Sequence, residues 1–203
     1  MKLYYTPTSP FVRKVMLVAH ETGQAGRIET TFLRPTPTKT DAGLSQDNPI
    51  SKIPALILPD GSPLYDSAVI CEYLDSAHAG PKLIPPSGDA RWRVLRLEAL
   101  VDGILEAAVS VFYERTLRPK ELVWEDWIQG QSQKVRQGLD ALETEAPRFG
   151  PDVDLAQLCA GAAVGWLEFR SVLGDIRAGR PALFAWYDRF RERPSMRATE
   201  PHA

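Results

Sequence analysis

Three short segments in the first seventy residues carry side chains that could bind a small charged ligand. They are Ser9-Pro10-Phe11-Val12-Arg13-Lys14, Lys52-Ile53-Pro54 and Asp66-Ser67. A serine followed by proline is typical of a helix start, with the serine as N-cap and proline at the first helical position. Asp66-Ser67 predicts a second helix start. Because the first turn of a helix presents free amides and the positive end of its dipole, both starts favour anionic groups.

The signals around these segments predict a mixed α/β unit. Strands are expected at residues 3–5, 28–33, 55–58 and around Leu64, and helices at about 9–23 and 66–79. The polar, proline-broken stretch 35–47 predicts a loop with at most one short helix. Pro59-Asp60-Gly61-Ser62 predicts the turn of a hairpin. Strand, helix, strand, hairpin and helix in this order are typical of a thioredoxin-like domain.

The remainder of the chain contains helical signals only. Residues 80–88 are rich in proline and glycine, and predict a linker between a first domain, 1–79, and a second, 89–203. Helices are expected at about 89–116, 124–145, from Asp154 onward, and 182–193. The helix that follows Asp154 is apolar or small on nearly every face, so it should be buried. Asp154 and Gln157 are placed to form a reciprocal cap at its start.

Composition and charge exclude several classes of partner. The 203 residues include 24 basic and 26 acidic side chains, a net charge of -2, which provides no electrostatic basis for binding nucleic acid or an anionic membrane. No run approaches the roughly 20 apolar residues that cross a bilayer, and no secretory signal opens the chain. Cys71 and Cys159 form no CxxC and no metal-ligand spacing. The simplest interpretation is a cytoplasmic protein without metal or disulfide.

The motifs together resemble those of the cytosolic glutathione transferases, specifically bacterial members with a Ser-Pro-Phe-x-Arg-Lys opening. The resemblance covers essentially the whole chain and extends to Asn48-Pro49, Lys52-Ile53-Pro54, Asp66 to Ile70, Tyr73-Leu74, Asp154-Leu155-Ala156, Gly165 to Arg170, Trp186 and Arg193-Pro194-Ser195. Two places near the expected site differ from the family pattern: Ser51 stands where glycine is common, and Asp66 where glutamate or glutamine is. The resemblance implies a thioredoxin-like N-terminal domain, an all-α C-terminal domain, glutathione as co-substrate and a homodimer.

The resemblance gives Ser9 the central chemical role. A free thiol has a pKa of roughly 8.5, and a helix N-terminus with a hydrogen-bond donor lowers it. The Ser9 hydroxyl would donate to the glutathione sulfur, with the amides of Phe11 and Val12 aimed at the same point. The alternatives are that Ser9 is only an N-cap, and that Tyr5, at the end of the first strand, is the activating group. For Tyr5 a packed strand aromatic is the favoured interpretation.

The other glutathione contacts are also implied by the resemblance. Ile53-Pro54 matches a cis-proline site at which Ile53 would pair with the cysteinyl backbone; a trans proline at a strand start is the alternative. Ser67 would bind the γ-glutamyl carboxylate and Asp66 its ammonium group, and a simple helix cap is the alternative for both. Lys52 and Arg13 are weaker candidates for the anionic ends of the ligand. For Arg13 a solvated surface charge is favoured.

The pocket for a second, electrophilic substrate is expected between the domains, lined by Phe11 and by the long helix near Tyr113. On periodicity, Trp166 and Phe169 should belong to the core. Asp102 is an acid on the apolar stripe of the long helix. Two interpretations stay open: it reaches a ligand, in its own chain or across a dimer interface, or it is an internal polar group with its own partner.

The function implied is transfer of glutathione to a small hydrophobic electrophile. A glutathione-dependent isomerase, dehalogenase or peroxidase would use the same thiolate with a different second pocket. A non-catalytic binding or regulatory protein of the same fold is the rival from another class. A glutaredoxin-like reductase is disfavoured, because Cys71 and Cys159 have apolar helical neighbours and should be inert.

Overall fold

A four-stranded mixed sheet forms the N-terminal part of the computed structural model, which describes residues 1–202. Its strands are β1 (Lys2–Tyr5), β2 (Glu29–Phe32), β3 (Leu56–Ile57) and β4 (Pro63–Leu64). The strand order is β2-β1-β3-β4, with β1 parallel to β2 and the other neighbours antiparallel. Every expected strand is present, so the predicted thioredoxin-like arrangement is confirmed.

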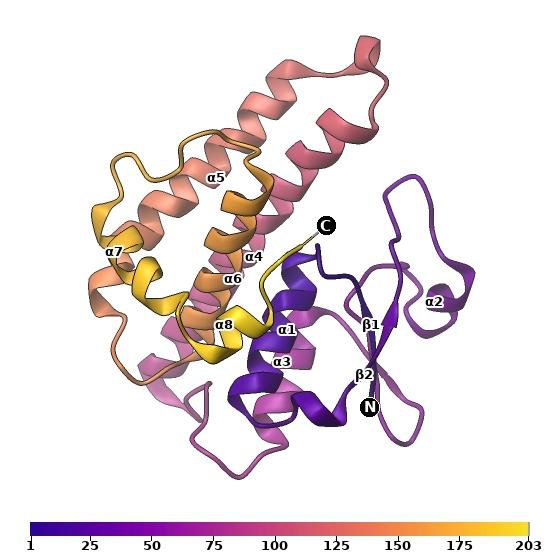
Figure 1. The fold of residues 1–203 in the computed structure, drawn as a ribbon, viewed down its shortest axis with the longest axis vertical. Helices are drawn as coiled ribbons and strands as arrows, with labels where there is room; N and C mark the ends of the chain where they lie inside the picture. Colours follow the sequence, from indigo (N-terminus) through magenta and orange to yellow (C-terminus); the bar gives the residue numbers. More distant parts are fainter. Residues whose placement is uncertain (203) are drawn as a thin grey trace.

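Three helices accompany this sheet: α1 (Pro10–Glu21), α2 (Ala42–Asp47) and α3 (Ser67–Ser76). Helices α1 and α3 pack against each other on the side toward the rest of the molecule, and α2 lies beyond the sheet on the other side (Figure 1). Tyr4 packs with Leu44 of α2, whereas its neighbour Leu3 belongs to the main core, as the alternation along a strand requires. The chain leaves α1 through Gly23, at φ +68°, where glycine avoids the left-handed penalty.

The second half is helical, as predicted. Its helices are α4 (Gly88–Leu117), α5 (Glu125–Glu145), α6 (Leu155–Arg170), α7 (Pro181–Phe190) and α8 (Pro194–Ala198). Short 3-10 turns at Lys120–Leu122 and Ala146–Arg148 flank α5, and another at Ala25–Arg27 precedes β2. The helix expected at about 182–193 is present as α7, which ends three residues earlier, after Phe190. Helix α8 was not predicted; it begins at Pro194, whose fixed φ suits a first helical position. Residues 155–167 of α6 are buried, as expected.

The start of α6 differs from the predicted reciprocal cap. Asp154 Oδ1 accepts the Gln157 amide at 2.9 Å, which is the expected half. The Gln157 side chain donates instead to the Asp152 carbonyl at 2.9 Å. The prediction that the Gln157 side chain pairs with Asp154 was therefore wrong, although both observed hydrogen bonds stabilise the same first turn.

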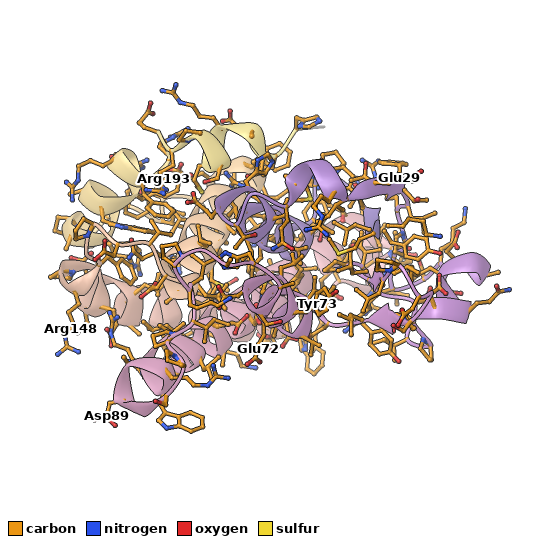
Figure 2. The ribbon with its side chains drawn as sticks, turned by 90° about the horizontal axis from the view of Figure 1, so that it is seen from below. Glu29, Glu72, Tyr73, Asp89, Arg148 and Arg193 are labelled. Carbon is orange, nitrogen blue, oxygen red and sulfur yellow. The ribbon has the colours of Figure 1, made fainter. Side chains whose placement is uncertain are left out.

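The sheet half and the helical half lie side by side, with Glu29 of β2 near one end and Arg148 of the helical half at the other (Figure 2). One hydrophobic core runs through both, drawing residues from β1, α1, α3 and the helices α4 to α7. The connecting segment is tied to each half: Asp75 of α3 accepts the Leu83 and Ile84 amides, and the Leu83 carbonyl accepts the Leu155 amide. The division into 1–79, 80–88 and 89–203 stays a prediction, and Ala203 lies outside the described residues.

Candidate functional site

Ser9 lies at the start of α1, where its hydroxyl can accept one hydrogen bond and donate another. Its Oγ accepts the Val12 amide at 3.3 Å, so it does cap the helix. A hydroxyl has one proton and two acceptor lone pairs, and capping therefore leaves the proton free to donate. The Phe11 amide has no hydrogen-bond partner within residues 1–202, whereas the Val12 amide is used by the cap. A ligand atom beside Ser9 would meet the hydroxyl and one amide, not the two amides expected.

The loop that carries Ser9 is held from both halves of the molecule. The Ser9 amide donates to the Thr6 carbonyl at 3.2 Å. The indole Nε1 of Trp166, on α6, donates to the Thr8 carbonyl at 2.9 Å. Trp166 is buried, as predicted, but its periodicity carries no sign of this polar contact. The helical half therefore positions the residue next to Ser9.

Tyr5 ends β1 and is half-buried. Its carbonyl accepts the Leu33 amide at 2.9 Å, and its hydroxyl has no hydrogen-bond partner among residues 1–202. Burial raises the pKa of the Tyr5 hydroxyl, so it is a neutral donor at neutral pH. Tyr4 faces the other side and donates to Asp47 Oδ2 at 2.6 Å. A contribution of Tyr5 to thiol activation stays a prediction.

The loop around Pro54 exposes the backbone of Ile53. The Ile53-Pro54 bond is cis, as the resemblance implied. The buried Asn48 side chain donates to the Lys52 carbonyl at 2.8 Å and so orders the approach to Ile53. Neither the amide nor the carbonyl of Ile53 has a partner within residues 1–202, and both are available to an extended peptide-like ligand. The Lys52 side chain is exposed.

Ser51 shows why glycine is common at this position in the family. Its φ is +50°, in the left-handed region, which favours glycine because it has no Cβ. The Ser51 hydroxyl accepts the Asp41 amide at 3.0 Å. This bond at the start of α2 offsets part of the conformational cost.

Asp66 and Ser67 begin α3 and play different parts. The Asp66 Oδ1 accepts the Ala68 amide at 3.1 Å, and the residue is exposed. Ser67 is buried, yet neither its amide nor its hydroxyl has a hydrogen-bond partner among the described residues. Free donors at the N-terminus of a helix are suited to a carboxylate.

A buried ion cluster lies next to this second helix start. Lys14 of α1 is fully buried, and its Nζ lies 3.2 Å from Glu98 Oε1 and 2.8 Å from both oxygens of Asp102. Burial is the largest cause that raises the pKa of both carboxyls. Lys14 lowers the pKa, nearby acids including Asp66 raise it, and the net shift is upward for each. The internal-partner interpretation of Asp102 is therefore confirmed, while contact with a ligand stays a prediction. Counting Asp66, three carboxyl groups are set against the single ammonium group of Lys14, so the ionised cluster has excess negative charge.

Sequence reasoning missed Lys14 and Glu98. Lys14 follows Phe11 by three residues and lies on the buried face of α1. Glu98 and Asp102 stand four residues apart along α4, so they share a face. Two acids on the apolar stripe of one helix and a lysine on the apolar face of another were the available signal.

The prediction of a solvated Arg13 was wrong. Its side chain is buried, and Nη2 donates to the Met196 carbonyl of α8 at 3.2 Å. Arg13 lines a cavity of about 290 Å³ among α1, α6, α7 and α8, with Tyr187, Glu168 and Phe169 also in its wall. None of the other candidate site residues lines it. Phe169 is half-buried here, so its assignment to the core was also wrong.

The side of the site expected to hold the electrophile is aromatic. Phe11 and Tyr113 are half-buried. Phe112 meets Trp166 edge to face, with ring centroids 6.3 Å apart. Burial raises the pKa of the Tyr113 hydroxyl, while the charges of two arginines oppose this rise. Phe11 and Tyr113 as a common pocket wall stay a prediction.

The two cysteines are buried, as predicted. Burial raises the pKa of both thiols well above its usual range, so neither is a thiolate at neutral pH. Within residues 1–202, no group of His, Cys, Asp and Glu side chains is arranged to hold a metal ion, and no helix is long and apolar enough to cross a membrane.

Comparison with known proteins finds relatives over the whole chain. Family models of the glutathione S-transferase N-terminal and C-terminal domains match residues 8–77 and 125–189. An uncharacterized GST-like protein of Escherichia coli K12, YibF, is 34% identical over 204 residues, covering 99% of this chain and 98% of that protein. A glutathione transferase family member from Pseudomonas fluorescens Pf-5, solved with bound glutathione, is 47% identical with a TM-score of 0.97, covering 100% of this chain and 99% of that one. Another structure from that organism, with bound S-(propanoic acid)-glutathione, is 44% identical with a TM-score of 0.92 and covers 100% of both chains.

Proposed function

Because this chain belongs to the glutathione S-transferase family, we propose that it activates the thiol of glutathione for attack on a small hydrophobic electrophile. The observation that carries this proposal is the start of α1. There the Ser9 hydroxyl keeps its proton free while its oxygen caps the helix, and the Phe11 amide beside it has no partner in the described residues. Two donors that converge on one point stabilise an anion such as a thiolate.

The proposed reaction runs through that thiolate. The glutathione thiol releases its proton to solvent, and Ser9 donates a hydrogen bond to the resulting sulfur anion. A sulfur lone pair then forms the carbon–sulfur bond, and the leaving group departs with the electron pair of the bond that breaks. Each unit by which the thiol pKa falls corresponds to about 1.4 kcal/mol of preference for the thiolate.

The rest of glutathione is proposed to lie along the edge formed by the Pro54 loop and α3. The free backbone groups of Ile53 would pair with the cysteinyl residue, and Ser67 would bind the γ-glutamyl carboxylate. Asp66 and the excess negative charge around Asp102 would accept the γ-glutamyl ammonium group. The relatives solved with bound glutathione and with bound S-(propanoic acid)-glutathione support glutathione as the ligand.

A homodimer and a cytoplasmic location belong to the same proposal. Tyr65, Val69 and Trp92, on or beside α3 and α4, expose 39%, 47% and 65% of their surface, an apolar group that a second copy of the chain would cover. Free buried cysteines suit a reducing compartment. Sedimentation analysis should find a dimer, and Trp92→Arg should shift it toward the monomer. A monomeric wild-type protein would contradict the dimer.

Calorimetric titration of glutathione tests the binding part of this proposal. Wild type should bind, Ser67→Ala should bind more weakly, and Ser76→Ala, at the far end of the same helix, should match wild type. If wild type does not bind at millimolar glutathione, the transferase proposal fails and a non-catalytic binding or regulatory role becomes the better interpretation.

The absorbance of the bound thiolate against pH tests the role of Ser9. The thiol pKa should rise in Ser9→Ala and stay near wild type in Tyr5→Phe. Ser9→Gly is the matched control for folding, because glycine replaces a serine N-cap at a cost of only a few tenths of a kcal/mol. A larger rise in Tyr5→Phe than in Ser9→Ala would assign activation to Tyr5.

A further inference from the structure

Arg170, the last residue of α6, carries a positive charge that no acid balances. Its Cζ lies 4.5 Å from the ring centroid of Phe112 and 4.8 Å from that of Phe169, and such contacts hold a guanidinium in place. Its Nε is buried and has no hydrogen-bond partner, and the side chain forms no ion pair within residues 1–202. An unsatisfied buried donor is costly, so a ligand that supplied an acceptor at this place would be stabilised by Arg170.

A second arginine approaches from the sheet half. Arg34 follows β2 directly and comes next to Leu33, whose amide pairs with the Tyr5 carbonyl. Arg34 also has no ion pair among the described residues. After burial, the charge of Arg34 is the next cause that lowers the pKa of Arg170.

Tyr113 of α4 lies beside the ring on which Arg170 is held: its own ring centroid is 5.6 Å from that of Phe112. Burial raises the pKa of its hydroxyl, while the charges of Arg170 and Arg34 lower it. The hydroxyl has no hydrogen-bond partner within residues 1–202 and stays protonated at neutral pH. Arg170, Arg34 and Tyr113 thus supply donors from three separate segments, with no acceptor for them among the described residues.

Two backbone contacts connect the segments that carry these arginines with the chain just before Ser9. Trp166, which donates to the Thr8 carbonyl at 2.9 Å, precedes Arg170 by four residues on α6. Arg170 therefore lies about one helical turn, or 5.4 Å of rise, farther along the same face. Arg34 follows Leu33, whose amide pairs with the Tyr5 carbonyl at the end of β1, four residues before Ser9.

We propose that Arg170, Arg34 and Tyr113 form an anion subsite beside Ser9, and that this subsite binds a carboxylate on the electrophile. This inference rests on the proposed transferase function and narrows its substrate class to electrophiles that carry both a hydrophobic body and an acidic group. A guanidinium held by aromatic rings can grip a carboxylate with two hydrogen bonds. The aromatic rings of Phe112 and Tyr113 would contact the rest of the substrate.

A matched pair of glutathione conjugates tests the subsite without requiring turnover. S-(2-carboxyethyl)glutathione and S-(2-carbamoylethyl)glutathione share size and shape and differ in charge. By calorimetry, wild type should bind the acid about tenfold more tightly than the amide, or better, as expected for a charge-assisted pair. Arg170→Met should abolish this preference and leave amide binding near wild type. Arg170→Lys should keep part of it.

The controls separate this inference from the function it rests on. Arg189→Met, at an exposed arginine of α7, should keep the full preference. Arg34→Met, in a surface segment, should reduce the preference even if Arg170→Met fails to fold. Equal wild-type affinity for acid and amide overturns the subsite, while normal binding of glutathione itself keeps the proposed function. If Arg170→Met weakens glutathione as much as the acid conjugate, the donors serve a carboxylate of glutathione and the inference fails. If glutathione does not bind to wild type, both fail.

Discussion

Replacing Lys14 with methionine should expose how strongly the buried ion cluster depends on one cation. Methionine keeps most of the volume of the side chain but removes the ammonium group that lies 2.8 Å from Asp102 and 3.2 Å from Glu98. Removing one partner of a buried ion pair costs about 3–5 kcal/mol. The Asp102 side chain is 22% exposed, so water reaches it. We therefore expect the lower end, about 3 kcal/mol, near pH 8.

The loss should depend on pH in a defined direction. Burial raises the pKa of Glu98 and Asp102, and without Lys14 both should rise further. A carboxyl whose folded pKa exceeds its unfolded value, about 4, contributes stability below that value and loses it as the pH rises through the folded pKa. The Lys14→Met deficit should therefore be small near pH 4 and grow toward pH 8.

The ammonium group of Lys14 adds no pH dependence in this range. Burial alone would lower its pKa, but its partners hold it well above the usual range. The carboxylates supply this charge, because the nearby thiols of Cys71 and Cys159 stay neutral at such pH. A lysine with a raised pKa contributes stability below its unfolded value, about 10.4, and loses it only as the pH rises through the folded pKa.

Urea unfolding at several pH values measures this prediction. Lys134→Met, at an exposed lysine of α5, is the matched control and should cost little at any pH. Glu98→Gln in the Lys14→Met background should restore part of the stability at pH 8, because it removes a buried charge. A Lys14→Met deficit below about 1 kcal/mol at pH 8, or one equal at both ends of the range, would refute the reasoning.

Two further outcomes are expected from single substitutions. Gly138→Ala in α5 brings a methyl group into steric overlap with Cγ1 of Ile104 and should cost about 1–3 kcal/mol of stability. Gly130→Ala in the same helix places its methyl group more than 4 Å from any neighbouring atom and should raise the free energy of unfolding by roughly 1 kcal/mol. Similar urea unfolding midpoints for the two variants would contradict this packing. Burial raises the pKa of Glu21, but hydrogen bonds from Arg193 and a serine of α8 outweigh it and lower the pKa. Glu21→Gln should therefore lose about 1 kcal/mol at pH 7, and this loss should shrink as the pH falls through the folded pKa; a loss that is constant down to pH 3 would count against it.

Local signals accounted for most of the fold. Ser9-Pro10 and Asp66-Ser67 marked helix starts, because a cap is decided by residues two or three positions apart. The end of the first helix near Gly23 was also predicted from local sequence. Helix α8, by contrast, was not predicted, because its 5 residues are too few to show a helical period, and its position against α1 depends on tertiary packing.

Polar residues on buried faces were harder to predict. Arg13 was expected in solvent because arginine usually is, yet the α8 carbonyl it binds is 183 positions away in the sequence. Lys14 was overlooked for the same reason, since its acidic partners are 84 and 88 positions away. Burial of a charge is decided by whether a partner arrives from another element.

Neighbouring residues along the chain were enough to predict the succession of strands and helices and the two helix starts, and the family resemblance predicted the cis-proline loop. Which of these groups meet depends on the three-dimensional packing. The packing places Trp166 against the residue before Ser9, Lys14 between two acids, and Arg170 on the ring of Phe112. Contacts of this kind arise from the packing of distant elements around a common core, and no local pattern carries their geometry.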